Sequence, residues 1–280
     1  MEKPNAGDMK GASKDFLESN SLVTKFVFII GLLILFLAAL RFFISVGAWL
    51  FMESPTPHFT DGITNTDTGF VISVNPNKSN STPVLRSVNE REGLEFTYSI
   101  WLYVKEPPTE EKCIFRKGPP GGKVGATREK WVSNGPGLYI VNNNNEAQLT
   151  AVMDYYESTG QLTNKIEIIG VKIPVRSWVN VMVRCNNKNL DILINGVLNS
   201  STLMPGVPKQ NYYDIQFSGG GAGKEPFKGF ISDFWYWNYS LGTNAIMNLV
   251  KNGPNIKNLK KTQTMDGKVP KYLAYSWFMN

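Results

Sequence analysis

A long apolar stretch near the N-terminus constrains this chain more than any other feature. Residues 26–40 contain no polar side chain, and apolar residues resume after Arg41 and continue to Met52. The uninterrupted part alone would form a helix of roughly 22 Å, which is shorter than the ~30 Å hydrocarbon core of a bilayer. We therefore predict one transmembrane helix with its interfacial flank over residues 22–52.

The charged ends of this segment make the prediction workable. Lys25 and Arg41 can extend their side chains towards opposite interfaces, and Trp49 would then lie at the far interface, where aromatic rings are favoured. The protein is expected to be single-pass, with membrane lipid as one partner. Four lysines precede the span, which favours a cytoplasmic N-terminus and a C-terminal domain on the other side: Lys3, Lys10, Lys14 and Lys25.

A cleaved signal peptide is the competing interpretation of the same segment. The apolar stretch is long for a signal peptide, and the preceding residues 1–21 form a polar tail that carries acidic as well as basic side chains. No A-x-A cleavage site follows the stretch. These features favour an anchor.

The remaining chain divides by composition. Residues 53–92 are rich in Pro, Asn, Ser and Thr and indicate an extended connector, with an edge strand over 69–74. From residue 93, short aromatic and β-branched segments recur at roughly ten-residue spacing with turn signals between them, a pattern typical of a β-sandwich. We expect the sandwich over 93–254, with one helix over 242–251, and a tail over 255–280 that packs on it.

Individual strands are predicted from these segments, and two turns support them. The strands are 96–104, one that begins at 114, 137–141, 148–153, 165–171, 178–185, 190–194, 214–217 and 229–237. Asn195-Gly196 is the strongest hairpin signal, and residues 142–145 can supply the positive φ angles of another turn. The fold class is therefore mainly β.

Four segments, in this order, resemble the concanavalin A-like lectin/glucanase superfamily in its laminin-G/pentraxin-type form. They begin at Phe96 (FTYSIWLY), Ile173 (IPVRSW), Leu190 (LDILINGV) and Phe227 (FKGFISDFWYWNYSL). The resemblance implies a jelly roll of two stacked antiparallel sheets. Membrane-anchored proteins of this kind are similar to proteins of large eukaryotic DNA viruses. Because members include glycosidases, sugar binders and adhesion modules, the fold does not choose the function.

The residues argue against catalysis. Glucanases of the superfamily carry E-x-D-x-x-E on one strand, and retention requires two carboxylates about 5 Å apart. This motif is absent, and the only histidine, His58, lies in the connector. We expect no enzyme activity and no cofactor.

Metal and nucleic-acid sites are weakly indicated at most. Calcium is the one ion to consider, since relatives hold it through loop oxygens, but the candidates fall in no recognisable calcium loop and suit ordinary turns: Asp154, Asp191, Asn195 and Asp214. The net charge of +6 is spread along the chain, which argues against nucleic acid as a partner. Cys113 and Cys185 suit buried apolar positions, and their pairing stays open.

Aromatic side chains are the main candidates for ligand or partner contacts. Tyr155-Tyr156 and Tyr212-Tyr213 are expected at loop edges, where they could stack on sugars. Trp235 and Trp237 project from the other face of their strand than Phe234, so a partner or the C-terminal tail would cover one face; ordinary packing is the simpler interpretation. Four asparagines lie in N-x-Ser/Thr sequons and would be glycosylated in a secretory lumen: Asn77, Asn80, Asn199 and Asn238.

These observations lead to a non-catalytic, membrane-anchored jelly roll that binds other molecules. The favoured role is a minor capsid protein that joins a viral internal membrane to the capsid, with capsid or other structural proteins as partners and a location in the virion. The alternative is a membrane-tethered lectin at a cell surface, with glycans as partners. A glycoside hydrolase ranks third.

Overall fold

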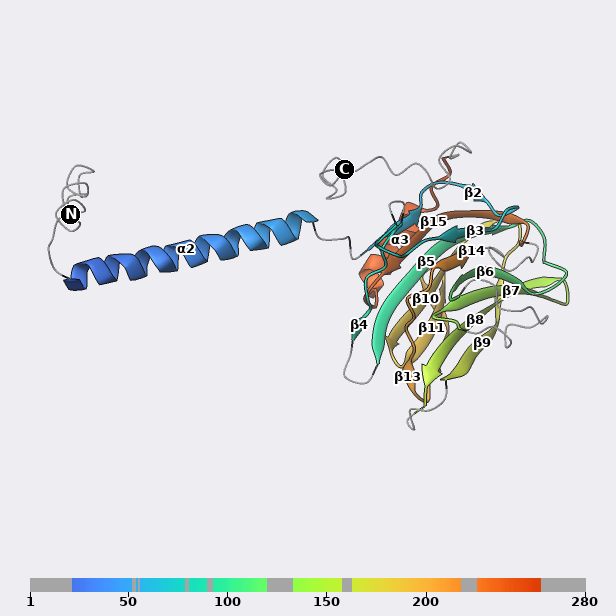
Figure 1. Ribbon diagram of the computed structural model, residues 1–280. Coiled ribbons are helices and arrows are strands. Elements are labelled where there is room, and N and C mark those ends of the chain that lie inside the picture. Colours follow the sequence, from blue (N-terminus) through green and yellow to red (C-terminus); the bar gives the residue numbers. More distant parts are fainter. Residues whose placement is uncertain are drawn as a thin grey trace, which may run out of the picture. The chain divides into compact units, whose positions relative to one another are not determined.

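The computed structural model describes residues 22–51, 54, 56–78, 81–89, 93–119, 133–157, 163–217 and 226–257. The chain divides into one unit that contains the helix α2 (Leu22–Phe51) and a second compact unit over Glu53–Lys271. Figure 1 shows both units. The predicted polar tail 1–21, the sequon at Asn80 and residues 258–280 of the predicted C-terminal tail lie outside the described residues.

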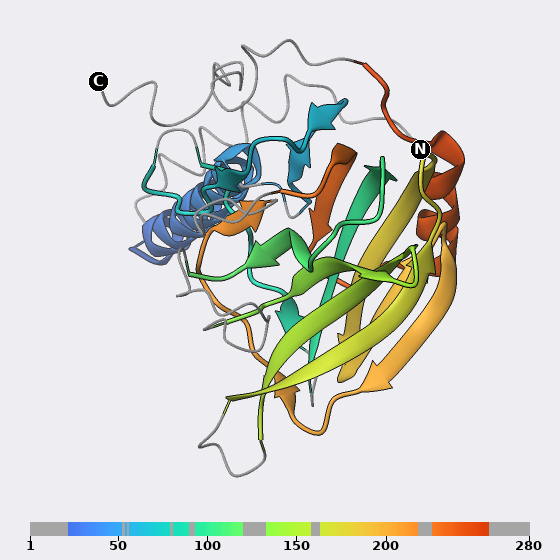
Figure 2. The same cartoon turned by 90° about the vertical axis from the view of Figure 1, so that its right-hand side faces the viewer.

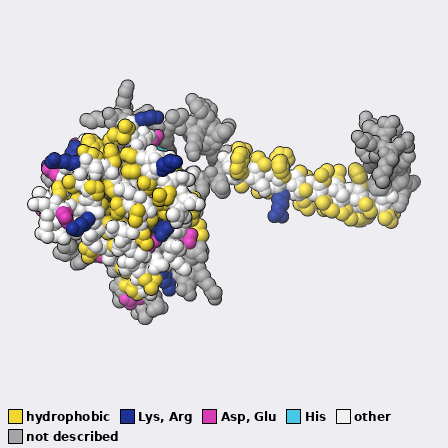
Figure 3. Space-filling model, turned by 180° about the vertical axis from the view of Figure 1, so that it is seen from behind, with side chains coloured by type: hydrophobic (Ala, Val, Ile, Leu, Met, Phe, Trp, Pro, Cys, Tyr) yellow, Lys and Arg dark blue, Asp and Glu magenta, His cyan; other side chains and the backbone are white. Residues whose placement is uncertain are grey.

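Helix α2 matches the predicted apolar segment. Its residues Leu22–Leu50 are long and apolar enough to cross a membrane, although a signal sequence near an N-terminus has the same properties. The side chains of Lys25, Arg41 and Trp49 are all exposed on it, and hydrophobic side chains cover most of the visible surface of the helix (Figure 3). At 30 residues, the helix is roughly 45 Å long and exceeds the hydrocarbon core.

The second unit is a sandwich of two antiparallel sheets, and in Figure 2 the green to yellow strands of one sheet lie in front of the teal, gold and orange-red strands of the other. The first sheet has the order β1 (His58–Thr60), β15 (Gly229–Trp237), β5 (Leu94–Val104), β10 (Trp178–Asn187), β11 (Asn189–Ile194) and β12 (Val197–Leu203), with β2 (Thr64–Asn65) beside β15 and β4 (Val88–Asn89) beside β5. The second sheet has the order β13 (Val207–Pro208), β8 (Glu146–Tyr156), β7 (Gly137–Asn143), β6 (Lys112–Lys117), β14 (Ile215–Phe217) and β3 (Phe70–Ile72), with β9 (Thr163–Ile173) beside β8. The predicted fold class, a mainly β two-sheet sandwich with one N-terminal apolar helix, is confirmed.

Alternation of side chains along the strands builds the core between the sheets. In β5, every second residue belongs to the main hydrophobic cluster: Phe96, Tyr98, Ile100, Leu102 and Val104. The predicted turns also form. Asn195 and Gly196 have φ angles of 50° and 80° and join β11 to β12, while Asn144 and Asn145 join β7 to β8. Only positive φ angles give a two-residue turn the twist of its flanking strands.

A bulge in β15 decides which of its alternating large rings face the core. The register shifts between Ser232 and Trp235, and Asp233 has a φ angle of 48°. As a result Phe234 and Tyr236 enter the main core, whereas Trp237 lies in a second cluster on the outer face with buried Ile246 of helix α3 (Thr243–Asn252). Helix α3 therefore covers the face that the sequence analysis assigned to a partner or to the C-terminal tail.

The segment predicted as a connector is part of the sandwich. Strands β1, β2 and β4 join the first sheet. Strand β3 forms an edge of the second sheet and lies within the edge strand predicted over 69–74. These strands have only two or three residues, and prolines interrupt the segment, so the period-two pattern is too short to reveal them. Cys113 and Cys185 are both buried, lie in different sheets and form no disulfide with each other.

Candidate ligand-binding site

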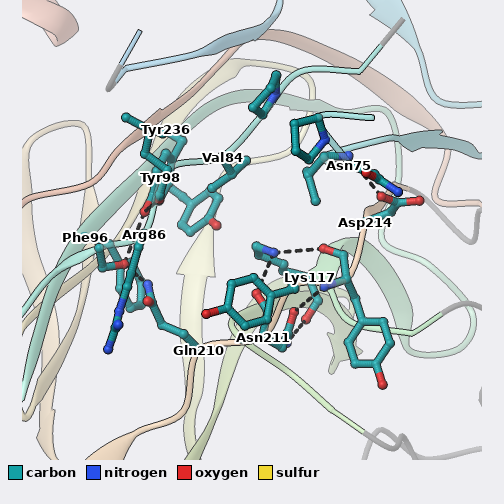
Figure 4. A pocket seen from close by; sticks show the side chains of 18 of the residues that line it. Asn75, Val84, Arg86, Phe96, Tyr98, Lys117, Gln210, Asn211, Asp214 and Tyr236 are labelled. Carbon is teal, nitrogen blue, oxygen red and sulfur yellow. Dashed lines mark hydrogen bonds between the residues drawn. The ribbon is translucent and has the colours of Figure 1, made fainter. Parts of the chain in front are cut away.

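A pocket of about 670 Å³ opens between two segments far apart in sequence. One wall consists of residues from 74–78 and 83–87, which were predicted as part of the connector, and the other is the loop from Gln210 to Asp214. Buried side chains of β5, β6 and β15 complete the lining (Figure 4). The volume suits one or two sugar rings or another small ligand.

Lys117, from β6, fastens the second wall. Its ammonium donates hydrogen bonds of 2.8 Å to the backbone carbonyls of Asn211 and Tyr213, and the Asn211 amide donates back to the Lys117 carbonyl at 2.9 Å. The residue is 7% exposed. Burial lowers the pKa of Lys117 to about 8, an effect that the nearby Asp214 carboxylate partly opposes.

Asp214 connects the two walls. Its Oδ1 atom accepts a 2.9 Å hydrogen bond from the backbone N–H of Val74 and a longer one from the Ser73 hydroxyl. It is the only acidic side chain among the described residues that line the pocket. A pair of carboxylates, as glycoside hydrolysis requires, is therefore not found in the described lining.

Two tyrosines from the core, Tyr98 and Tyr236, reach the pocket side by side, with their ring centroids 4.8 Å apart. The Tyr236 hydroxyl donates to the Leu85 carbonyl at 3.0 Å and lies 3.2 Å from the Ser87 hydroxyl, which also accepts from the Gln210 amide. Burial raises the pKa of Tyr236 to about 12 and raises that of Tyr98 well above its usual value. Both phenols are therefore neutral hydrogen-bonding groups at physiological pH.

The predicted tyrosines separate in the structure. Tyr212 and Tyr213 line the pocket and are 89% and 47% exposed. Tyr156 is exposed elsewhere, beneath the Lys209 ammonium at 5.3 Å from its ring centroid. Tyr155 is 9% exposed and belongs to the main core, so its ring has little surface for a sugar.

The two tryptophans predicted as partner contacts, Trp235 and Trp237, pack against other side chains of the protein. The Trp235 ring stacks on His58 at 3.7 Å between centroids and on Trp237 at 5.8 Å. Trp237 is 8% exposed beneath α3. Neither residue lines the pocket.

The four calcium candidates lie apart and have protein partners. Asp154 accepts from the Asn134 N–H, Asn195 from the Asn180 N–H, and Asp214 from Val74. Asp191 pairs with Arg184 at 2.8 Å and accepts from Ser201. Hydrogen bonds and an ion pair within the protein therefore account for the side-chain oxygens of all four residues.

Among the described residues, one group of side chains lies close enough together to hold a metal ion: His58, Asp61 and Asp233. Its groups already bind each other and the tail. Asp233 lies 3.2 Å from His58 and accepts from the Asn255 N–H, while the Asn255 amide donates to Asp61. The cluster ties residue 255 to β1 and β15.

Among the predicted sequons, Asn77 and Asn199 are exposed, and Asn238 is half-buried with its amide donating to the Arg86 carbonyl at 3.5 Å. Most residues that line the pocket, including Arg86, Lys117 and Gln210, were not predicted as ligand contacts from the sequence. No local pattern marks these residues, because the long-range pairing of β3 with β14 and of β4 with β5 brings them together.

Comparison with known proteins identifies the family. Residues 77–247 match the model described as the concanavalin A-like lectin/glucanases superfamily. The chain belongs to this superfamily. The match extends over more than half of the chain and includes both pocket walls from residue 77 onward. No curated protein matches the chain by sequence.

Several solved structures show a weak likeness to this chain. The ligand-binding domain of Botulinum neurotoxin serotype D, solved with N-acetylneuraminic acid, is 14% identical with a TM-score of 0.44, covering 69% of this chain and 42% of that one. The serotype G binding domain is 13% identical with a TM-score of 0.43, covering 70% of this chain and 46% of that one. Domain 4 of AbnA, a GH43 extracellular arabinanase from Geobacillus stearothermophilus, was solved with arabinotriose. It is 16% identical with a TM-score of 0.41, covering 71% of this chain and 89% of that one. This chain thus spans less than half of the toxin domains.

Proposed function

We propose that this protein is a membrane-tethered, non-catalytic glycan-binding domain, and that the ligand enters the pocket between residues 74–87 and 210–214. One observation carries the proposal. The described lining of the pocket combines an exposed tyrosine ring at the rim, Tyr212, with side-chain amides, buried tyrosine residues and a single carboxylate.

The chemistry of the lining fits a sugar. Aromatic rings stack on the apolar faces of sugar rings, and amides and phenols exchange hydrogen bonds with their hydroxyls. Gln210 and Asn211 lie on one wall, and Asn75 on the other (Figure 4). Among the described lining residues, Asp214 has no second acid beside it for general acid–base hydrolysis.

A matched pair of tyrosine substitutions tests the proposal. The full-length chain in lipid nanodiscs is applied to a glycan array, and the affinity of the best ligand is then measured for Tyr212→Ala and Tyr156→Ala. Both side chains are exposed, but only Tyr212 lines the pocket. We expect Tyr212→Ala to weaken binding about tenfold, with Tyr156→Ala close to wild type. An array without binding, or equal effects of the two substitutions, would contradict the proposal.

A structural role between a viral membrane and a capsid is the second candidate. Besides the apolar helix, five large apolar side chains on or next to strands β9, β12 and β13 are exposed on the sandwich: Ile169, Val197, Leu198, Leu203 and Val207. Exposed apolar side chains of this kind suit a protein partner. The test is to locate the protein in purified virus particles by mild detergent extraction and cross-linking. Its absence from particles, or from the layer between membrane and shell, would remove this candidate.

A further inference from the structure

We propose that the pocket selects an anionic sugar, with its carboxylate or sulfate group held by Arg86 and Lys117. This inference rests on the glycan-binding function proposed above and specifies its ligand class. Two features carry it, the charge of the lining and the free donors of its cations, and an accessible tyrosine hydroxyl in the lining adds a further contact.

The charge of the lining is predominantly positive. Lys78, Arg86 and Lys117 line the pocket, against the single carboxylate of Asp214. That carboxylate is already engaged by the N–H of Val74. A ligand that enters the pocket therefore meets an excess of positive charge, which favours an anion and disfavours a cation.

The cations retain donors for such an anion. The exposed side chains of Arg86 and Lys78 form no ion pair or hydrogen bond with the described residues, whereas the backbone carbonyl of Arg86 is held by Asn238. A guanidinium presents two parallel N–H donors that match a carboxylate or a sulfate. Lys117 uses two of its three ammonium protons on backbone carbonyls, so one remains.

Tyr98 offers the pocket a further hydrogen-bonding group. It is 2% exposed and lines the pocket, yet its hydroxyl forms no hydrogen bond with the described part of the chain. The hydroxyl oxygen is not among the buried, unpartnered side-chain atoms of the described residues, so it is accessible from the pocket and can exchange hydrogen bonds with a ligand. The neighbouring hydroxyl of Tyr236 is satisfied by Leu85, which shows that this part of the core can supply partners. An oxygen atom of the ligand would complete Tyr98.

The test compares three forms of one oligosaccharide: neutral, carboxylated and sulfated. Binding to the full-length chain in nanodiscs of zwitterionic lipid is measured for wild type, Arg86→Gln, Lys78→Gln and Lys251→Gln. Lys251 is the control, because it is an exposed lysine on α3 outside the pocket. We expect an anionic form to bind at least tenfold more tightly than the neutral form. Arg86→Gln should remove about tenfold of this preference and Lys78→Gln less, while Lys251→Gln leaves it unchanged.

Each outcome decides between the two proposals. Tighter binding of the carboxylated or of the sulfated form identifies which anion the pocket holds. Equal binding of all three forms, unaffected by Arg86→Gln, would overturn the anionic specificity and leave the glycan-binding function intact. An absence of binding by all three forms, together with an empty glycan array, would overturn both.

Discussion

At the scale of single residues, Tyr98 and Tyr236 are neighbours with opposite hydrogen-bonding states. Tyr236 satisfies the Leu85 carbonyl, whereas the Tyr98 hydroxyl has no partner among the described residues. Removing one partner of a buried hydrogen bond leaves the other unsatisfied, but removing an unsatisfied hydroxyl does not. The two residues are therefore a matched pair for separating stability from binding.

Phenylalanine substitutions exploit this difference. Tyr236→Phe should lower the free energy of unfolding by about 1–2 kcal/mol, because the Leu85 carbonyl loses its donor. Tyr98→Phe should leave stability unchanged or raise it slightly, and should weaken glycan binding. Thermal unfolding and binding titrations measure both effects. Destabilisation by Tyr98→Phe equal to that by Tyr236→Phe would show that the Tyr98 hydroxyl has a structural partner.

Lys117 gives a second residue-scale prediction, through pH. Its pKa falls from about 10.5 in the unfolded chain to about 8 in the folded one. Between these values the unfolded state binds more protons, so the free energy of unfolding should rise with pH from 8 to 10.5. Below pH 8 the cost of burying the charged ammonium is fully present.

The variant Lys117→Met isolates this effect from the other lysines and tyrosines that titrate in the same range. Chemical unfolding at several pH values should give a wild-type curve that rises relative to the variant above pH 8. Parallel curves for the two proteins would contradict the assigned burial of Lys117. The variant also loses the bonds to the Asn211 and Tyr213 carbonyls, which should weaken binding at any pH.

At the scale of elements, helix α3 protects the outer face of the first sheet. Ile246 is 2% exposed and packs in one cluster with Trp237, whereas its neighbour Met247 is 53% exposed. Burial of an apolar side chain, and the cavity left when it is truncated, together set the cost of substitution.

Two alanine substitutions on this helix measure that protection. Ile246→Ala should lower the free energy of unfolding by about 2–4 kcal/mol and shift tryptophan fluorescence to longer wavelength as water reaches Trp237. Met247→Ala should have an effect within about 0.5 kcal/mol. Comparable losses for the two variants would mean that α3 does not cover this face.

The elements also show what sequence could predict. The long strands β5, β8, β10 and β15 follow local alternation or aromatic richness, and the Asn195-Gly196 turn follows from local φ preferences. The pocket does not, because its walls lie more than a hundred residues apart and meet only through pairing of very short strands. Tyr212 and Tyr213 were predicted as candidates, but Arg86 and Lys117 carry no local signal.

At the scale of the whole molecule, we propose that helix α2 tethers a binding domain to a membrane. Helix α2 has the length and composition of a membrane span, and a signal sequence would share them. With an N-terminal epitope tag, an anchored protein should stay in the membrane pellet after alkaline carbonate extraction and keep its tag. A soluble product without the tag would indicate cleavage instead.

The central claim is that a glycan binds in the pocket between residues 74–87 and 210–214. The most direct measurement uses the best ligand of the glycan array, made with a photoreactive group, on the full-length chain in nanodiscs, followed by mass spectrometry of the labelled peptides. The account predicts label on these two segments, lost when unmodified ligand competes. Competed label confined to the exposed edge at β9 and β12, or to α3, would contradict it.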